Sequence, residues 1–150
     1  YQTFALGQPA QLLTWLLLGD LADAQDLAAG KLTHRRVTSV LNLCPDHMLA
    51  EERLSLQQNL AVRGVHPYME LFADSRSGYG IINIDLPAPL HFAGNARDSG
   101  GSVLVHCYGG VNRSGAVAIA LLMTLGRKTL LAATEDVVTK RGFVLSDDPP

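Results

Sequence analysis

The segment from Ser102 to Leu125 constrains the fold most, because a short β-branched run is followed closely by an apolar helix. Residues 102–106 (SVLVH), which Gly100 and Gly101 precede, predict a buried strand. Residues 114–125 (SGAVAIALLMTL) are apolar around nearly the whole helical circumference, and a helix of this kind is buried. A buried strand followed by a buried helix predicts an α/β fold.

The rest of the chain alternates between the same two kinds of element. Strands are expected at residues 12–18, 37–43 and 81–86, and helices at 22–29, at 47–62 and from the capping Thr129 to about Lys140. Residues 65–80 are expected to form a loop, and residues 90–98 carry only a weak pattern. This alternation places helices on the faces of a sheet, and 150 residues suit a single domain over 1–150.

Composition and charge exclude several classes of function. The net charge of −2 argues against a general binder of nucleic acid or of anionic membranes. The longest apolar runs fall short of the roughly 20 residues that span a bilayer, and no signal peptide is visible. The two cysteines, Cys44 and Cys107, form no CxxC pair and have no histidine at zinc-like spacing, so no metal site is expected. Such cysteine usage favours a reducing, intracellular location, cytoplasmic or nuclear.

Residues 107–114 (CYGGVNRS) connect the strand to the helix and carry the chemistry. Turns of this kind lie at the sheet edge where α/β proteins bind ligands. Gly109 and Gly110 allow the backbone to curl so that successive N–H groups point inward, and the helix N-terminus adds further donors. Arg113 adds a planar fork that can hold two phosphate oxygens. The loop therefore predicts a site for a tetrahedral oxyanion.

Cys107 lies at the mouth of this cradle. A helix N-terminus and cationic neighbours favour the thiolate form of a cysteine, and a thiolate beside a bound phosphate can attack phosphorus in line. Ser114 could hydrogen-bond the sulfur and help it leave when water cleaves a cysteinyl-phosphate, and His106 could orient the loop. The alternative is a core cysteine at a strand end with Arg113 as a surface cap, but the combination at this spacing favours the site.

The loop resembles the HC-x-x-G-x-x-R-S/T signature of the cysteine-based protein phosphatases, carried here by HCYGGVNRS. Its setting, VLVHCYGGVNRSGAVAIALLM, is similar to the dual-specificity branch of that superfamily. Further resemblance to this branch lies in WLLLGDLADAQDL, VTSVLNL, GYGIINIDLPA and KRGFVLSD, so that most of residues 12–148 are covered, and 47–78 least. The resemblance implies a central mixed, mostly parallel sheet flanked by helices, with a phosphate-binding loop between a strand and a buried helix.

The resemblance also implies roles for individual residues. Cys107 would be the nucleophile, Ser114 would assist hydrolysis, and Asp85 would be the general acid that protonates the leaving oxygen. The phosphate would be bound by Tyr108, Gly109, Gly110, Val111, Asn112 and Arg113. The implied reaction is hydrolysis of phosphotyrosine and phosphoserine or phosphothreonine in a phosphoprotein substrate. It passes through a cysteinyl-phosphate and needs no cofactor, and neither nucleic acid nor membrane is expected as a partner.

Three features depart from the family pattern or leave a choice open. Asp85 precedes Cys107 by fewer residues than in relatives, as if residues 91–101 (HFAGNARDSGG) were a helix without its middle. Asp85 is then either the acid or a turn residue, and Asp98 is the alternative acid, although its glycine-rich surroundings are typical of a turn. The long connection over 47–78 is either a recognition element or a surface insertion. Cys44 either packs in the core or, as in some relatives, traps the oxidised nucleophile as a disulfide.

Two other functions stay open at this point. RNA 5′-phosphatases of the superfamily resemble HC-x-x-G-x-N-R-T-G, which Asn112 and Gly115 echo, whereas the acidic balance of the chain counts against RNA. A phosphoprotein-binding module with weak catalysis is the third reading. The presence of both Cys107 and Arg113 argues against it, because a pure binder has no use for a reactive thiolate.

Overall fold

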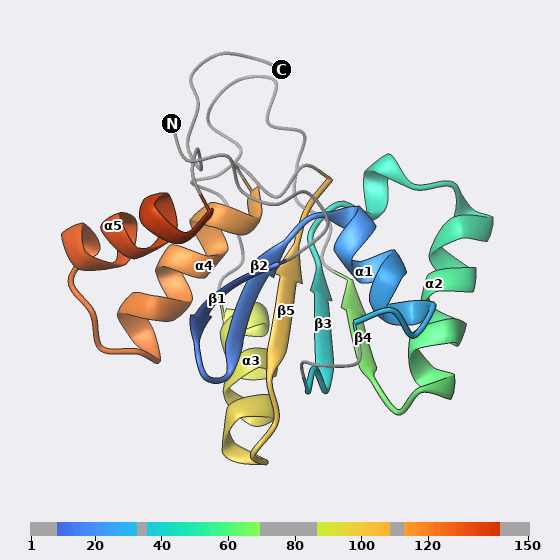
Figure 1. The fold of residues 1–150 in the computed structure, drawn as a ribbon, viewed down its shortest axis with the longest axis horizontal. Helices are drawn as coiled ribbons and strands as arrows, with labels where there is room; N and C mark the ends of the chain where they lie inside the picture. The colour runs from blue at the N-terminus through green and yellow to red at the C-terminus, as the bar shows by residue number, and fades with distance from the viewer. Residues whose placement is uncertain (1–8, 33–35, 70–86, 109–112, 142–150) are drawn as a thin grey trace.

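The computed structural model describes residues 9–32, 36–69, 87–108 and 113–141 (Figure 1). Within these ranges, five strands form one sheet in the order β1-β2-β5-β3-β4. The antiparallel pair is β1 (Ala10–Leu13) with β2 (Leu16–Gly19). The parallel strands β5 (Val103–His106), β3 (Ser39–Asn42) and β4 (His66–Met69) continue from β2. This arrangement confirms the predicted mixed, mostly parallel sheet.

Two hydrophobic layers cover the two faces of the sheet, and the alternation of side chains along each strand separates them. Leu104 packs in the layer beneath α1 (Leu21–Ala28) and α2 (Ala50–Val62). Its neighbours Val103 and Val105 pack in the other layer. That layer is closed by α3 (Pro87–Asp98), α4 (Arg113–Thr124) and α5 (Leu130–Arg141). Both layers bury strand residues completely, so the central strands hold the loops that follow them in fixed positions.

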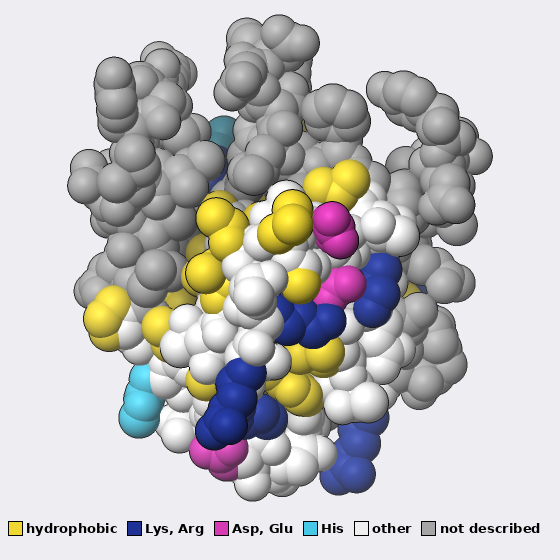
Figure 2. All heavy atoms as spheres, turned by 90° about the vertical axis from the view of Figure 1, so that its left-hand side faces the viewer, with side chains coloured by type: hydrophobic (Ala, Val, Ile, Leu, Met, Phe, Trp, Pro, Cys, Tyr) yellow, Lys and Arg dark blue, Asp and Glu magenta, His cyan; other side chains and the backbone are white. Residues whose placement is uncertain are grey.

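Four of the predicted helices are confirmed. The helix expected from residue 47 begins later, at Ala50, because a short 3-10 helix over Pro45–His47 comes first. Gly64, which follows α2, has a φ of 75°, a backbone conformation that glycine adopts without strain. The outer side of α5 carries the exposed aliphatic side chains of Leu130, Leu131 and Val138 among charged groups (Figure 2). No helix in the described ranges is long and apolar enough to cross a membrane.

The single strand predicted over 12–18 is wrong, because this segment folds as the hairpin of β1 and β2. Thr14 and Trp15 form the turn, and neither is a glycine, asparagine or proline that would mark a hairpin in the sequence. The apolar residues on both sides of the turn therefore read as one run. The backbone carbonyl of Trp15 accepts a hydrogen bond from Val103 at 2.8 Å, so the turn itself is tied to the next strand.

The loop expected over 65–80 contains a strand in its described part. β4 pairs in parallel with β3, and His66 lies opposite Ser39. Its side chains are only partly buried and include Pro67, which is tolerated on an edge strand. A short edge strand without a run of apolar residues leaves no clear pattern in the sequence.

Residues 87–98 form a twelve-residue helix, so a regular helix replaces the weak pattern expected over 90–98. Pro87 and Pro89 occupy the first turn of α3, where a proline lacks no needed hydrogen-bond donor. Ala93 and Ala96 pack into the core in place of larger apolar residues, which explains the weak hydrophobic period. The strand predicted over 81–86 lies outside the described residues.

Candidate active site

The candidate site lies where β5 ends and α4 begins. His106 is the last residue of β5, Cys107 follows it, and Arg113 is the first residue of α4. This is the carboxyl edge of the parallel strands, where the sequence predicts the anion site. Tyr108 is described, and its side chain is exposed. Asp85, Gly109, Gly110, Val111 and Asn112 lie outside the described residues.

The structure brings together the sulfur of Cys107 and the hydroxyl of Ser114. The Sγ–Oγ distance is 3.1 Å, and Cys107 and Ser114 are 5% and 0% exposed. The hydroxyl belongs to the second residue of α4, because the helix begins at Arg113. A hydroxyl at this distance can donate a hydrogen bond to a thiolate, as the sequence predicted.

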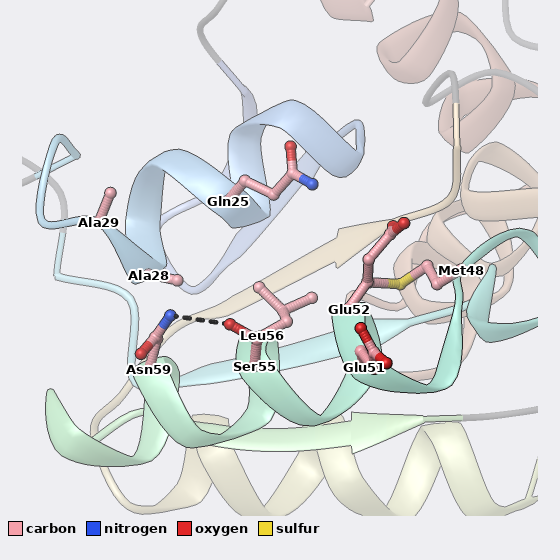
Figure 3. Close-up of a pocket in the computed structure, with 9 residues that line it drawn as sticks. All are labelled: Gln25, Ala28, Ala29, Met48, Glu51, Glu52, Ser55, Leu56 and Asn59. Carbon is pink, nitrogen blue, oxygen red and sulfur yellow. Dashed lines mark hydrogen bonds between the residues drawn. The ribbon is translucent and has the colours of Figure 1, made fainter.

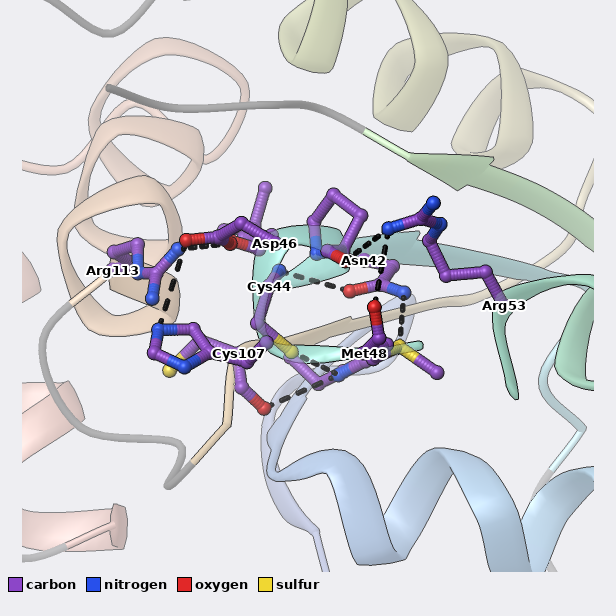
Figure 4. Close-up of polar contacts among 11 residues, drawn as sticks. Asn42, Cys44, Asp46, Met48, Arg53, Cys107 and Arg113 are labelled. Carbon is purple, nitrogen blue, oxygen red and sulfur yellow. Dashed lines mark hydrogen bonds and ion pairs between the residues drawn. The ribbon is translucent and has the colours of Figure 1, made fainter. Parts of the chain in front are cut away.

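Arg113 reaches back from α4 to the loop that follows β3 (Figure 4). Its Nη1 donates to the carbonyl oxygen of Leu43 at 3.0 Å and to Oδ1 of Asp46 at 2.8 Å. Sequence reasoning did not single out Asp46. The available signal was that Asp46 follows a parallel strand, and the loops after parallel strands meet at one edge of a sheet.

His106 is fully buried beneath the site. Burial is the main cause that lowers the pKa of its imidazole to about 4, so the ring is neutral near pH 7. Its Nδ1 lies 3.3 Å from the carbonyl oxygen of Cys107, and because a carbonyl only accepts, Nδ1 is the donor. Its Nε2 has no hydrogen-bond partner among the described residues. The ring therefore contacts the backbone of the residue predicted as nucleophile, and its supporting role stays a prediction.

Cys44 is a buried free thiol on the same edge. Burial is the largest cause that raises its pKa to about 12, and Cys107 adds to the shift. Its Sγ lies 4.0 Å from Nδ1 of His106, which places it directly below the site. It belongs to the same hydrophobic cluster as Cys107 and Leu43.

The N-terminus of α1 braces the predicted phosphate loop from the other side. The backbone N–H of Leu21 donates to the carbonyl of Tyr108 at 3.2 Å. Asp20 caps this helix, and its side chain accepts from the N–H of Asp23 at 2.8 Å while the Asp23 side chain accepts from the N–H of Asp20 at 3.0 Å. This reciprocal cap fixes the start of α1, and with it the donor that holds Tyr108.

The alternative acid Asp98 is far from this edge in the topology. It ends α3, and the chain then enters β5 from the opposite end to Cys107. Its carboxylate is exposed and accepts from Nε of Arg97 at 3.1 Å. Asp98 is thus the last helical residue before the turn of Ser99 and Gly100, and it lies at the opposite end of β5 from Cys107.

A groove of about 350 Å³ opens between α1 and α2 (Figure 3). Its polar lining includes the carboxylates of Glu51 and Glu52. Neither Cys107 nor Arg113 lines it. The groove is therefore separate from the candidate site, although Met48 of the loop after β3 contributes to its wall.

Comparison with known proteins matches this chain to one family. Residues 21–148 match the family model described as dual specificity phosphatase, catalytic domain. The chain is 30% identical over 141 residues to human dual specificity protein phosphatase 2. The aligned region covers 92% of this chain and 40% of that protein. The chain is 32% identical over 134 residues to dual specificity protein phosphatase MPK-4 of Drosophila melanogaster, with 87% and 31% covered.

Solved structures of low sequence identity share the fold. Human DUSP28 superposes with a TM-score of 0.71 at 22% identity, covering 93% of this chain and 84% of that one. Tk-PTP in its active form superposes with a TM-score of 0.69 at 22% identity, and the match covers 95% of this chain and 90% of that one. The chain spans 40% or less of the length of the two curated relatives described above. With a family model that matches residues 21–148, the resemblance carried by HCYGGVNRS is confirmed, and the chain belongs to the dual specificity phosphatase catalytic-domain family.

Proposed function

We propose that this chain is a protein phosphatase domain that hydrolyses phosphotyrosine and phosphoserine or phosphothreonine in phosphoproteins. The observation that carries the proposal is the 3.1 Å contact of the Cys107 sulfur with Ser114, at the end of a parallel strand and beside the first residue of a buried helix. Membership of the family supports the same reaction. An intracellular location is part of the proposal, since the chemistry needs a reduced thiol.

The first step forms a bond between the Cys107 sulfur and phosphorus while the ester P–O bond breaks. The backbone N–H groups of residues 108–113 and the Arg113 guanidinium stabilise the charge on the phosphoryl oxygens. Asp85 gives its proton to the leaving oxygen, so that the protein product departs as an alcohol or phenol. No cofactor takes part, because the sulfur is the nucleophile.

The second step returns the enzyme to its starting state. Water attacks phosphorus, the S–P bond breaks, and Asp85 takes up the proton from water. Ser114 donates a hydrogen bond to the sulfur as it regains its negative charge. Inorganic phosphate is released, and the atoms and charges of the cycle balance.

The test compares wild type with Cys107→Ser on phosphotyrosine and phosphothreonine peptides and on 5′-triphosphorylated RNA. We expect wild type to turn over the peptides and Cys107→Ser to leave them intact. Cys44→Ser is the matched control, since it replaces the other buried thiol and should retain turnover. Equal inertness of wild type and Cys107→Ser, with phosphopeptide still bound, would contradict catalysis and favour a binding module. Faster turnover of RNA would contradict the substrate class.

The role of Asp85 has a test of its own within the same assay. Asp85→Asn should slow a substrate with a poor leaving group far more than one with a good leaving group, because only the former needs a proton. Asp98→Asn is the control, since Asp98 lies at the other end of β5. An unchanged rate of Asp85→Asn on the poor leaving group would remove Asp85 from the mechanism.

A further inference from the structure

We propose that Asp46 is a positioning residue that holds one edge of the Arg113 guanidinium, so that the opposite edge faces the phosphate. The inference rests on the proposed function, because it assigns the partner that orients the phosphate clamp. Asp46 accepts from Nη1 of Arg113 at 2.8 Å. This contact joins two residues that are 67 positions apart in the chain.

The pattern of contacts at Arg113 selects one edge of the guanidinium. Nη1 carries two hydrogens, and it donates to both Asp46 and the Leu43 carbonyl. The other edge, formed by Nε and Nη2, keeps its two parallel N–H bonds in the geometry that matches two phosphate oxygens. The Asp46 contact therefore uses the nitrogen that a phosphate held by the Nε–Nη2 edge does not need.

The loop that carries Asp46 is itself fixed in place (Figure 4). Arg53 of α2 donates through Nη1 to the carbonyl of Pro45 at 2.9 Å and to that of Met48 at 3.1 Å. These bonds hold both ends of the short 3-10 helix on which Asp46 lies. On the strand side, Oδ1 of the buried Asn42 accepts from the N–H of Cys44 at 2.9 Å.

A second contact ties this loop to the predicted phosphate loop. The ring of His47 lies 5.7 Å from the ring of Tyr108, centroid to centroid. Two neighbouring residues of the 3-10 helix thus contact Tyr108 and Arg113, on the two sides of the predicted phosphate loop. The sheet order explains this, since β3 and β5 are adjacent and Asn42 lies opposite His106.

Holding Arg113 before the substrate arrives has an energetic benefit. A long arginine side chain loses rotamer freedom when it binds, and a side chain that is already fixed pays less of this entropy at the binding step. The Arg113 side chain is only 15% exposed in its present position. A carboxylate that competed with phosphate would instead occupy the Nε–Nη2 fork, and the described contacts of Asp46 use Nη1.

The experiment compares Asp46→Ala and Asp46→Asn with wild type in the whole chain. Two readouts are used: kcat/KM on a phosphopeptide and the dissociation constant of inorganic phosphate by calorimetry. We expect Asp46→Ala to lower kcat/KM roughly 10- to 100-fold and to weaken phosphate binding, because a misplaced clamp loses alignment. Asp46→Asn keeps an oxygen acceptor for Nη1 and should recover activity to within about fivefold of wild type.

The control is Glu51→Gln, which removes an exposed carboxylate from the start of α2, and it should match wild type in both readouts. Asp46→Ala with unchanged or increased kcat/KM would overturn the proposal, and an increase would show that Asp46 competes with phosphate. Failure of Asp46→Asn to recover activity would also overturn it. If wild type lacks turnover that depends on Cys107, the proposed function fails, whereas the phosphate affinities of the Asp46 variants still decide the positioning role.

Discussion

Replacing Asp23 with asparagine should change how the stability of the protein depends on pH. Asp23 is a fully buried carboxyl group on α1. One of its oxygens accepts from the N–H of Asp20, and among the described residues the other, Oδ1, has no hydrogen-bond partner. Asp20 is itself an acid, and its Oδ2 lies 3.7 Å from Nη2 of Arg141. The molecule thus keeps a poorly compensated carboxyl group in its interior.

Burial is the largest cause that raises the pKa of Asp23 from its ordinary value of 3.8 to about 6, against the backbone hydrogen bond that lowers it. The negative charge of Asp20 adds to the rise. Because the folded pKa lies above the unfolded one, the folded state takes up a proton first as the pH falls. Asp23 therefore makes the protein more stable as the pH falls from above 6 toward 3.8.

The asparagine variant keeps an oxygen acceptor for the Asp20 N–H and does not titrate. Between about pH 7.5 and about pH 5, the free energy of unfolding of wild type should gain about 1 kcal/mol relative to Asp23→Asn. His106 also affects stability in this range, because its imidazole takes up a proton in the unfolded state, near its ordinary pKa of 6.5, before it does so in the folded state. Its contribution to stability is therefore lost as the pH falls. It is present in both proteins and cancels in the difference.

Urea unfolding of both proteins across this pH range measures the difference directly. The expected result is that Asp23→Asn is at least as stable as wild type near pH 8 and loses this advantage near pH 5. Parallel curves of unfolding free energy against pH would refute the reasoning, whatever their vertical offset. They would mean that Asp23 has the same proton affinity in the folded and unfolded states.

Two further predictions concern α4. Ser114→Ala removes the hydroxyl that lies 3.1 Å from the Cys107 sulfur, and should slow breakdown of the cysteinyl-phosphate more than its formation. Rapid-quench kinetics should then show a burst of alcohol product, and a steady-state rate equal to wild type would contradict the role. Leu122→Ala empties a fully buried position between α4 and the sheet, and should lower the free energy of unfolding by about 2–5 kcal/mol. A loss below about 1 kcal/mol in urea unfolding would show that the core closes around the missing side chain.

An element was predicted correctly where its sequence pattern lies within one continuous segment, and was missed where the pattern is weak or shared with its neighbours. The strand at 103–106 and the buried helix after it were predicted because their pattern lies within one continuous segment. The turn at Thr14 and Trp15 was missed because both flanking strands are equally apolar. The helix from Pro87 to Asp98 was underestimated because small residues fill its buried face.

The sequence by itself determined which residues are predicted to bind phosphate, since eight consecutive positions from Cys107 to Ser114 carry the types and the spacing that an anion cradle needs. Tertiary structure alone decided what surrounds that segment. The loop after β3 contacts Arg113 because β3 lies beside β5 in the sheet, and strand order is set by packing of the two hydrophobic layers. An interaction between residues 67 positions apart leaves no spacing in the sequence, so the position of Asp46 after a parallel strand was the only hint, and the contact itself required the fold.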